Sequence, residues 1–272
     1  MWTCPNCNRI FEREKQMHSC KKVSLEEHFK NKDKAQELFK FLQSSKDTEE
    51  KRLASLEWAY LSLLDGYHGA SPTVLHRSLQ SDPNFFAELI SRVFRSKNEP
   101  KKSKKSITEQ ESAIARNAYK LLSSIKQVPG VGDNGFVDEK KLTDWVTHAR
   151  KACTESGHLE VCDTRIGEIF AFAPLDADGS FPCSAVRKVI EKVKSEELEH
   201  GFEIGVYNKR GVHSRSLTEG GKPEHELAKQ YNDYADKCGL LFDRTVAALR
   251  RIAETYKRQA QLEDEKVEAR LD

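Results

Sequence analysis

The chain has 272 residues, of which 38% are hydrophobic and 32% are charged, and its 45 basic and 43 acidic residues leave a net charge of +2. This composition excludes an intrinsically disordered chain, which has few hydrophobic residues and a large net charge. A net charge so near zero also argues against a protein that coats nucleic acid along its length. The sequence has no apolar run near the ~20 residues that cross a bilayer and no signal-peptide core, so it predicts a cytoplasmic protein with no membrane partner.

The first 22 residues carry the most specific motif of the sequence. Cys4 and Cys7 are two residues apart in a Cys-Pro-Asn-Cys turn, and His18 and Cys20 are separated by a single residue, so each pair can direct two ligands at one ion. Three thiolates and one imidazole complete a tetrahedral Zn²⁺ site with no position left for water, which is typical of structural zinc. His28 is the alternative to His18 as the fourth ligand. Metal binding also explains how so short a segment folds, because it is too small to bury a core.

The residues of this motif, together with those that follow it, resemble the start of a known family. The matching residues are Trp2, Cys4, Pro5, Cys7, Phe11, His18, Cys20 and the run Leu25–Phe29. With them, residues 1–42 resemble the zinc-knuckle start of a family of small bacterial and archaeal proteins of unknown function. The resemblance implies metal binding at the four ligands and no further activity.

Hydrophobic residues recur with the 3.6-residue period of amphipathic helices from residue 24 onward. A capping box at Ser24 and Glu27 begins the first helix, and Pro72 and Pro83 mark two later helix starts, because proline fits the first helical turn. Further helices are expected over residues 47–65, 108–125, 138–154, 160–172, 184–197, 224–238 and from 243 onward, with a frayed end beyond Gln259. The sequence therefore predicts a mainly α protein, in which a small zinc knuckle precedes an irregular multi-helix bundle or an α-solenoid-like array.

A basic run interrupts the helical pattern between residues 95 and 105. It contains Pro100 and one acidic residue, Glu99, and it has no apolar side chain. We predict a linker or exposed loop here, so that the chain divides into a zinc knuckle at 1–22, a first helical segment at 23–95, the linker at 96–106 and a second helical segment at 107–272. The alternative is a nucleic-acid contact made jointly with the knuckle, by Arg9, Arg13, Lys101, Lys102, Lys104 and Lys105.

The glycine-punctuated segment at residues 205–215 is the second candidate site. We expect a loop here, with a short β segment at Val206 and Tyr207 at most. Its three basic residues form a candidate anion site, because guanidinium groups suit planar anions: Lys209, Arg210 and Arg215. The alternative, which we favour, is that the arginines pair with acidic residues such as Glu219 and Glu224 and hold helices together.

The same segment carries a second, weaker resemblance. The run Asn208–Arg215, with Gly220-Gly221 and the helix around Tyr231 after it, makes residues 53–272 similar to the C-terminal helical region of large uncharacterised bacterial proteins. This likeness implies a helical fold and a place in a larger bacterial assembly, and it assigns no activity.

Other apparent motifs fail on inspection. The run Pro129–Gly135 lacks the Lys-Ser/Thr of a phosphate-binding loop and is better explained as a turn. The Asp176–Ser180 loop has its glycine at the wrong position for calcium, and Arg187 stands where a bidentate glutamate is needed. Four scattered cysteines are predicted to be small buried hydrophobic residues: Cys153, Cys162, Cys183 and Cys238. We therefore expect a non-enzymatic helical interaction module with a structural zinc site and a protein partner; the alternative is a nucleic-acid-binding accessory protein.

Overall fold

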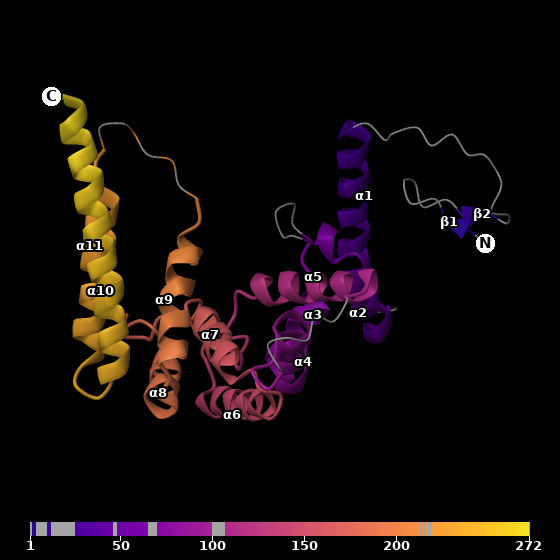
Figure 1. The fold of residues 1–272 in the computed structure, drawn as a ribbon, viewed down its shortest axis with the longest axis horizontal. Coiled ribbons are helices and arrows are strands. Elements are labelled where there is room, and N and C mark those ends of the chain that lie inside the picture. The colour runs from indigo at the N-terminus through magenta and orange to yellow at the C-terminus, as the bar shows by residue number, and fades with distance from the viewer. Residues whose placement is uncertain are drawn as a thin grey trace. The chain divides into compact units, whose positions relative to one another are not determined.

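The computed structural model describes residues 2–3, 10–11, 25–45, 48–64, 70–99, 107–212, 214, 216 and 219–271. Across these ranges the chain forms eleven α-helices, one 3₁₀ helix and two strands of two residues each (Figure 1). Helices account for 73% of the described residues, which confirms the predicted mainly α class. The chain divides into two compact units, Met1–Thr73 and Val74–Asp272. None of the helices described is long and apolar enough to cross a membrane.

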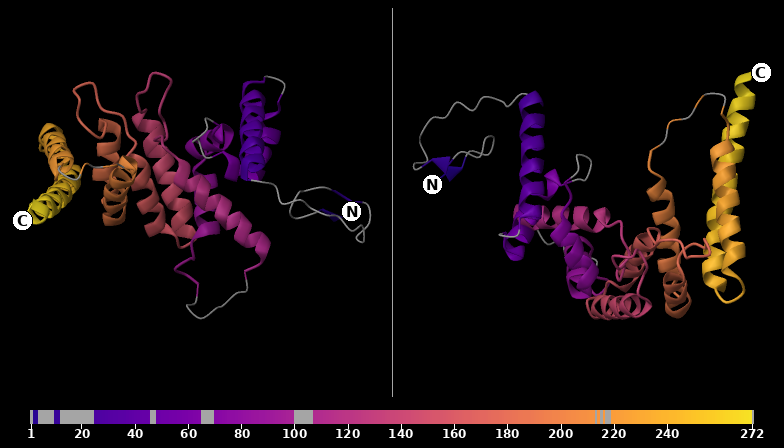
Figure 2. Two further views of the ribbon diagram at one scale, coloured as in Figure 1. Left: turned by 90° about the horizontal axis from the view of Figure 1, so that it is seen from above. Right: turned by 180° about the vertical axis from the view of Figure 1, so that it is seen from behind.

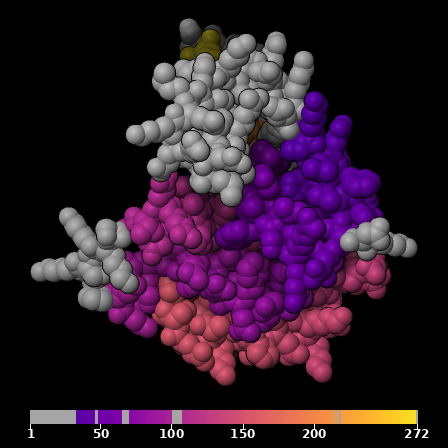
Figure 3. Space-filling view, turned by 90° about the vertical axis from the view of Figure 1, so that its right-hand side faces the viewer, coloured from indigo at the N-terminus to yellow at the C-terminus, as the bar shows by residue number. Residues whose placement is uncertain are grey.

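The first unit holds the strands β1 (Trp2–Thr3) and β2 (Ile10–Phe11), the helices α1 (Leu25–Ser44) and α2 (Glu50–Ala59), and the 3₁₀ helix η1 (Leu61–Leu63). The helix expected over 47–65 is therefore shorter and changes to a 3₁₀ turn at its end. Helix α1 packs against η1, and Figure 3 draws the part of this helix from residue 33 onward in indigo. Glu57 is fully buried and accepts hydrogen bonds from Gln43 Nε2 at 2.8 Å and from Thr73 Oγ1 at 3.3 Å. These bonds join α1, α2 and the start of the next helix.

The remaining helices begin at the residues that the sequence marks. The side chain of Asp82 accepts a hydrogen bond from the Asn84 amide at 2.9 Å, and Thr108 and Glu111 form a capping box. The helices after η1 are α3 (Thr73–Ser81), α4 (Pro83–Val93), α5 (Glu109–Ser124), α6 (Glu139–Glu155), α7 (Leu159–Phe170), α8 (Ser184–Val193), α9 (Glu196–Arg210), α10 (Lys222–Cys238) and α11 (Asp243–Leu271).

Within the second unit, each helix packs mainly on helices that are close to it in the chain. Helix α4 contacts α5 and α6, α6 contacts α7 and α8, α7 contacts α9, and both α8 and α9 contact α11, which pairs with α10 (Figures 1 and 2). The rings of Phe86 in α4 and Trp145 in α6 are 4.9 Å apart, and Trp145 Nε1 donates to the Leu79 carbonyl at 3.1 Å. Helices α4 and α5 pack together across the predicted linker 96–106, so the helices expected in a 23–95 segment are shared between the two units.

The expectation of a loop after Gly205 is wrong, because α9 continues to Arg210 and includes Val206 and Tyr207. The predicted 184–197 helix is instead two helices, α8 and α9, which part at Lys194 with a φ of 53°. Glycine in α9 is a packing residue and not a helix breaker. A Cβ atom on Gly201 would lie 2.0 Å from the Thr164 carbonyl oxygen of α7, so only glycine allows the two backbones this close.

Helix α11 continues past Gln259, where the sequence predicts a frayed end. It runs to Leu271, and Ala260 is its last buried residue. The carboxylate of Asp264 accepts a hydrogen bond from the Gly221 amide at 2.7 Å and lies 3.0 Å from His225 Nε2. The first turn of α10 therefore holds α11 beyond the buried core.

Candidate functional site

The two strands of the first unit lie on either side of the predicted Cys4–Cys7 turn. They pair antiparallel, with Trp2 opposite Phe11 and Thr3 opposite Ile10, so a six-residue connection, 4–9, joins them. Both cysteines of the pair fall in that connection. The four predicted ligands, Cys4, Cys7, His18 and Cys20, and the alternative His28 side chain lie outside what the structure describes. Of the candidate zinc site, the structure describes only the pairing of β1 with β2.

The basic run after α4 is described only at its beginning. Arg95 Nε lies 3.3 Å from a Glu99 carboxylate oxygen, and Lys97 forms an ion pair with Glu160 at the start of α7. Two of the basic side chains of the run thus pair with carboxylates of the same protein. The residues predicted to contact nucleic acid lie outside the described ranges: Arg9, Arg13, Lys101, Lys102, Lys104 and Lys105.

The second candidate site has two of its three basic residues in the last turn of α9. Arg210 Nη2 donates to a carboxylate oxygen of Glu224 at 2.6 Å, and the side chains of these residues are 19% and 2% exposed. The Arg210 guanidinium also lies 5.7 Å from the centre of the Tyr256 ring. Helices α9, α10 and α11 therefore meet at one buried ion pair. Arg215 lies outside the described residues.

Lys209, the neighbour of Arg210, contacts the connection between α7 and α8. Its ammonium donates to the Ala171 carbonyl at 3.1 Å and lies 5.6 Å and 5.7 Å from the ring centres of Phe172 and Phe181. Burial lowers the pKa of Lys209, because a charged amine loses solvation there. Lys209 and Arg210 thus point to different partners, and these contacts favour the structural role over a shared anion site.

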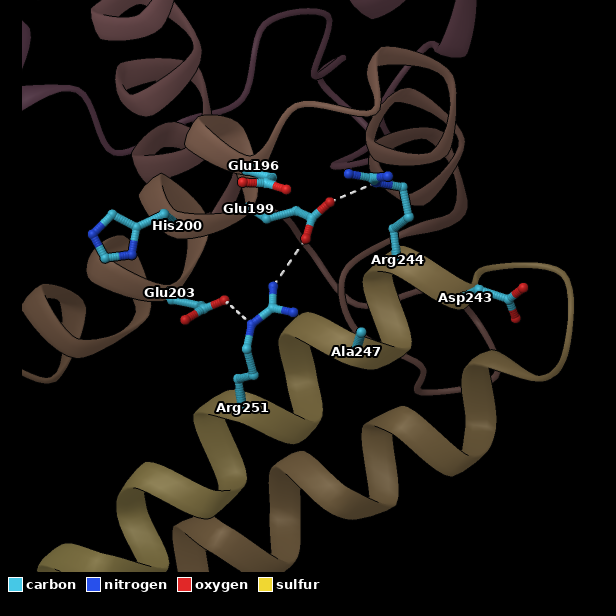
Figure 4. A pocket seen from close by; sticks show the side chains of 8 residues that line it. All are labelled: Glu196, Glu199, His200, Glu203, Asp243, Arg244, Ala247 and Arg251. Carbon is cyan, nitrogen blue, oxygen red and sulfur yellow. Dashed lines mark hydrogen bonds and ion pairs between the residues drawn. The ribbon is translucent and has the colours of Figure 1, made fainter.

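A groove of about 550 Å³ lies between α9 and α11 of the second unit (Figure 4). It is lined by Glu196, Glu199, His200, Glu203, Asp243, Arg244, Ala247 and Arg251. Glu199 is nearly buried and lies between two arginines, 2.6 Å from Arg244 Nε and 2.9 Å from Arg251 Nη2. Arg251 Nε also contacts Glu203 at 2.6 Å. The charged side chains at the centre of the groove are thus paired with one another.

This network of ion pairs holds the helices in position and does not activate a reactive group. The Glu203 and Glu199 carboxylates raise the pKa of Arg251 despite the loss of solvation, so its charge is held more firmly. Next to the groove, Glu191 of α8 accepts hydrogen bonds from the Thr245 amide at 2.9 Å and from its hydroxyl at 3.0 Å, which caps the first turn of α11. The arrangement joins three helices by charge-assisted bonds.

The loops that look like ligand motifs use their polar groups internally. In the 129–135 turn, the Gly132 amide donates to the Phe136 carbonyl at 2.9 Å, and the Asp138 amide donates to the Gly130 carbonyl at 2.9 Å. In the 176–180 loop, the Arg187 guanidinium bonds to Asp176, where a cation would stand in a calcium loop. Both motifs are therefore structural turns, as the sequence indicates.

His76 in α3 and Ser124 in α5 are in contact. His76 Nε2 lies 2.7 Å from Ser124 Oγ, and that hydroxyl donates to the Leu121 carbonyl at 2.9 Å. The Leu121 carbonyl therefore competes with the imidazole for the serine proton. Burial lowers the pKa of His76, which keeps the ring neutral near pH 7. The contact joins α3 to α5.

Sequence reasoning missed the network around Glu199, because it did not recognise α9 as a helix. Once residues 196–210 are taken as helical, Glu196, Glu199 and Glu203 fall three and four residues apart on one face. Arg244 and Arg251 are seven residues apart on one face of α11. This complementary spacing of acidic and basic residues is the sequence signal that indicates the network.

No family model matches the chain, and neither a curated protein nor a solved structure was found to match it. Among the residues that the structure describes, no group of three or more His, Cys, Asp or Glu side chains is placed to hold a metal ion.

Proposed function

We propose that the chain is a non-enzymatic helical interaction module whose N-terminal segment is a structural zinc knuckle, bound through Cys4, Cys7, His18 and Cys20. The observation that carries this proposal is the pairing of β1 with β2, because it brings together the two ends of the connection that contains Cys4 and Cys7. A short strand pair around a Cys-x-x-Cys turn suits two thiolates that bind one ion. A site with four protein ligands leaves no position for a reacting water, so its role is to fold the segment.

The second unit supports an interaction role and a protein partner. Its charged groups at Glu199 and Arg210 are engaged between helices, as described above. Leu240 and Leu241, in the connection between α10 and α11, are 94% and 86% exposed. Exposed apolar side chains that lie together are typical of surfaces that contact other proteins. We propose a protein partner in a larger assembly on this basis.

Removal of zinc tests the structural role of the knuckle. We expect a chelator to expose the trypsin sites of the first 22 residues, at Arg9, Arg13, Lys15, Lys21 and Lys22, because the segment has no core without metal. The far-ultraviolet circular dichroism of the helices should change little, since their cores contain no proposed zinc ligand. Equal cleavage rates in this segment with and without chelator would contradict the proposal.

The alternative, a nucleic-acid-binding accessory protein, can be distinguished by the salt dependence of its binding to nucleic acid. Contacts from Lys101, Lys102, Lys104 and Lys105 to phosphates would release counterions, so affinity for DNA or RNA would fall steeply as salt is raised. We expect no such binding above the level of a control protein of equal net charge in gel-shift assays. A salt-dependent shift that is lost when these four lysines are changed to glutamine would replace the protein partner with nucleic acid.

A further inference from the structure

A groove of about 540 Å³ lies beside α6 in the second unit, and we call it the α6 groove. Four segments line it: the end of α3, the start of α4, the 129–135 turn and one face of α6. The residues that α6 contributes are Lys141, Asp144, Trp145 and His148. They are spaced by three and four residues, so they lie on the same face of the helix.

The floor and one wall of the α6 groove are held rigidly. Trp145 is 5% exposed, and its indole is fixed by the Phe86 ring and the Leu79 carbonyl, as described above. The 129–135 turn packs directly on α6, since a Cβ atom on Gly130 would lie 3.2 Å from Lys141 Cβ. The groove is therefore formed before a ligand arrives, and a ligand can enter it with little rearrangement of the protein.

The polar groups at the rim of the α6 groove are not used to hold helices together. Lys141, Asp144 and His148 are exposed, and none of the described residues forms an ion pair with the Lys141 ammonium or the Asp144 carboxylate. His148 Nδ1 lies 2.7 Å from the Asp144 carbonyl, which can only accept, so Nδ1 donates and Nε2 is the nitrogen left for a ligand. This differs from the α9–α11 groove, where Glu199 is paired with two arginines.

These features fit a peptide better than a small molecule. Small-molecule sites bury most of their ligand, whereas a groove with an exposed rim can hold a segment of chain that continues beyond it. An extended peptide carries both kinds of group that the rim can bind: an acidic side chain for the Lys141 ammonium and a backbone amide for the Asp144 carboxylate. The floor at Trp145 suits an apolar side chain of the same peptide. Nucleic acid fits less well, because Asp144 repels phosphate.

We propose that the α6 groove binds an extended peptide segment of a partner protein, with an acidic side chain on Lys141, a backbone amide on Asp144 and an apolar side chain over Trp145. This inference rests on the proposed interaction role and adds to it the chemistry of the partner. The groove is formed by α3, α4, α6 and the 129–135 turn, whereas the exposed Leu240 and Leu241 lie in the connection between α10 and α11.

Selection from a phage library of random peptides tests the proposal without a known partner. The zinc-loaded full chain is immobilised, and phage that also bind a Ser81→Trp variant are removed. Ser81 lines the groove, and its hydroxyl bonds to carbonyls of its own helix, so tryptophan fills the groove without breaking a bond between helices. We expect the remaining peptides to share an acidic residue close to an apolar one. No enrichment over beads without protein, or a basic consensus, would overturn the proposal.

A charge reversal at the rim tests the predicted contact with Lys141. The consensus peptide is synthesised with a fluorescein label, and its affinity is measured by fluorescence anisotropy. We expect Lys141→Glu to bind it about tenfold more weakly than the parent, because the acidic side chain then meets a like charge. Lys229→Glu, at an exposed position of α10, makes the same change in net charge and should keep the affinity of the parent. Circular dichroism checks that both variants are folded. Equal affinities in the parent and Lys141→Glu would contradict the proposal.

Two further measurements separate the α6 groove from the other surfaces. The double variant Leu240→Ser/Leu241→Ser should bind the consensus peptide as the parent does, and a loss of binding would place the peptide outside the groove. Gel filtration tests a second copy of the chain as the occupant, and self-association that is lost in Lys141→Glu would replace the partner protein with that copy. A groove that fails these tests in a protein whose knuckle still resists trypsin until zinc is removed would reject the peptide site and leave the proposed zinc knuckle standing.

Discussion

Replacement of Gly201 by alanine is expected to lower the free energy of unfolding by about 3 kcal/mol. In an open helix the same change is stabilising by ~1 kcal/mol, because alanine has the higher helix propensity. Here the new Cβ atom would lie 2.0 Å from the Thr164 carbonyl oxygen and 2.7 Å from the carbonyl carbon. Both atoms belong to the backbone of α7, so the collision is relieved only by separating α7 from α9.

Glycines of both helices take part in the close contact between α7 and α9, which makes the collision harder to relieve. A Cβ atom on Gly167 of α7 would lie 2.0 Å from the Leu198 carbonyl oxygen, and one on Gly205 would lie 2.7 Å from the Glu168 carbonyl oxygen. Urea denaturation measures the effect, with Asn208→Ala at an exposed position of α9 as the control. The control should stay within about 0.5 kcal/mol of the parent. A Gly201→Ala protein as stable as the parent would show that α7 and α9 do not pack this closely.

Replacement of Arg210 by glutamine is expected to cost about 2 kcal/mol of stability. The guanidinium forms a 2.6 Å bond with Glu224, whose side chain is 2% exposed. The substitution therefore removes the positive charge that stabilises a buried carboxylate. Arg250 provides the matched control, because the side chains of its 2.5 Å ion pair with Asp236 are 49% and 64% exposed. Arg250→Gln should cost less than about 1 kcal/mol.

The same Arg210 variant also tests the anion-site alternative. If the last turn of α9 bound phosphate, added phosphate would raise the melting temperature of the parent protein by mass action and would not do so for Arg210→Gln. We expect no phosphate-dependent rise in either protein, and a loss of stability in the variant. A rise in the parent that disappears in the variant, with no loss of stability, would establish an anion site at Lys209 and Arg210.

The sequence was sufficient wherever local chemistry decides the structure. Asp82 and Pro83 begin α4, and Asp138 begins α6, because capping is an interaction between near neighbours in the chain. The turn at 129–135 and the internal use of Asp176 follow from loop chemistry in the same way.

It was insufficient where packing between distant elements decides. Gly201 and Gly205 look like helix breakers until α7 is known to lie against them, so α9 was missed and Lys209 and Arg210 were assigned to a loop. Asp264 looks like part of a solvated tail until Gly221 is seen to donate to it. By contrast, the burial of Cys153 and Cys162 is correctly predicted.

The zinc content of ligand variants tests the central claim most directly. Elemental analysis of the purified parent should give about one zinc ion per chain, as four protein ligands predict. Cys7→Ser should lose most of it, whereas Cys183→Ser, a buried cysteine in the second unit, should keep it. His18→Ala and His28→Ala decide the fourth ligand, and we expect only the first to lose zinc. A parent protein without zinc, or a Cys7→Ser protein that keeps a full equivalent, would contradict the assignment of a zinc knuckle.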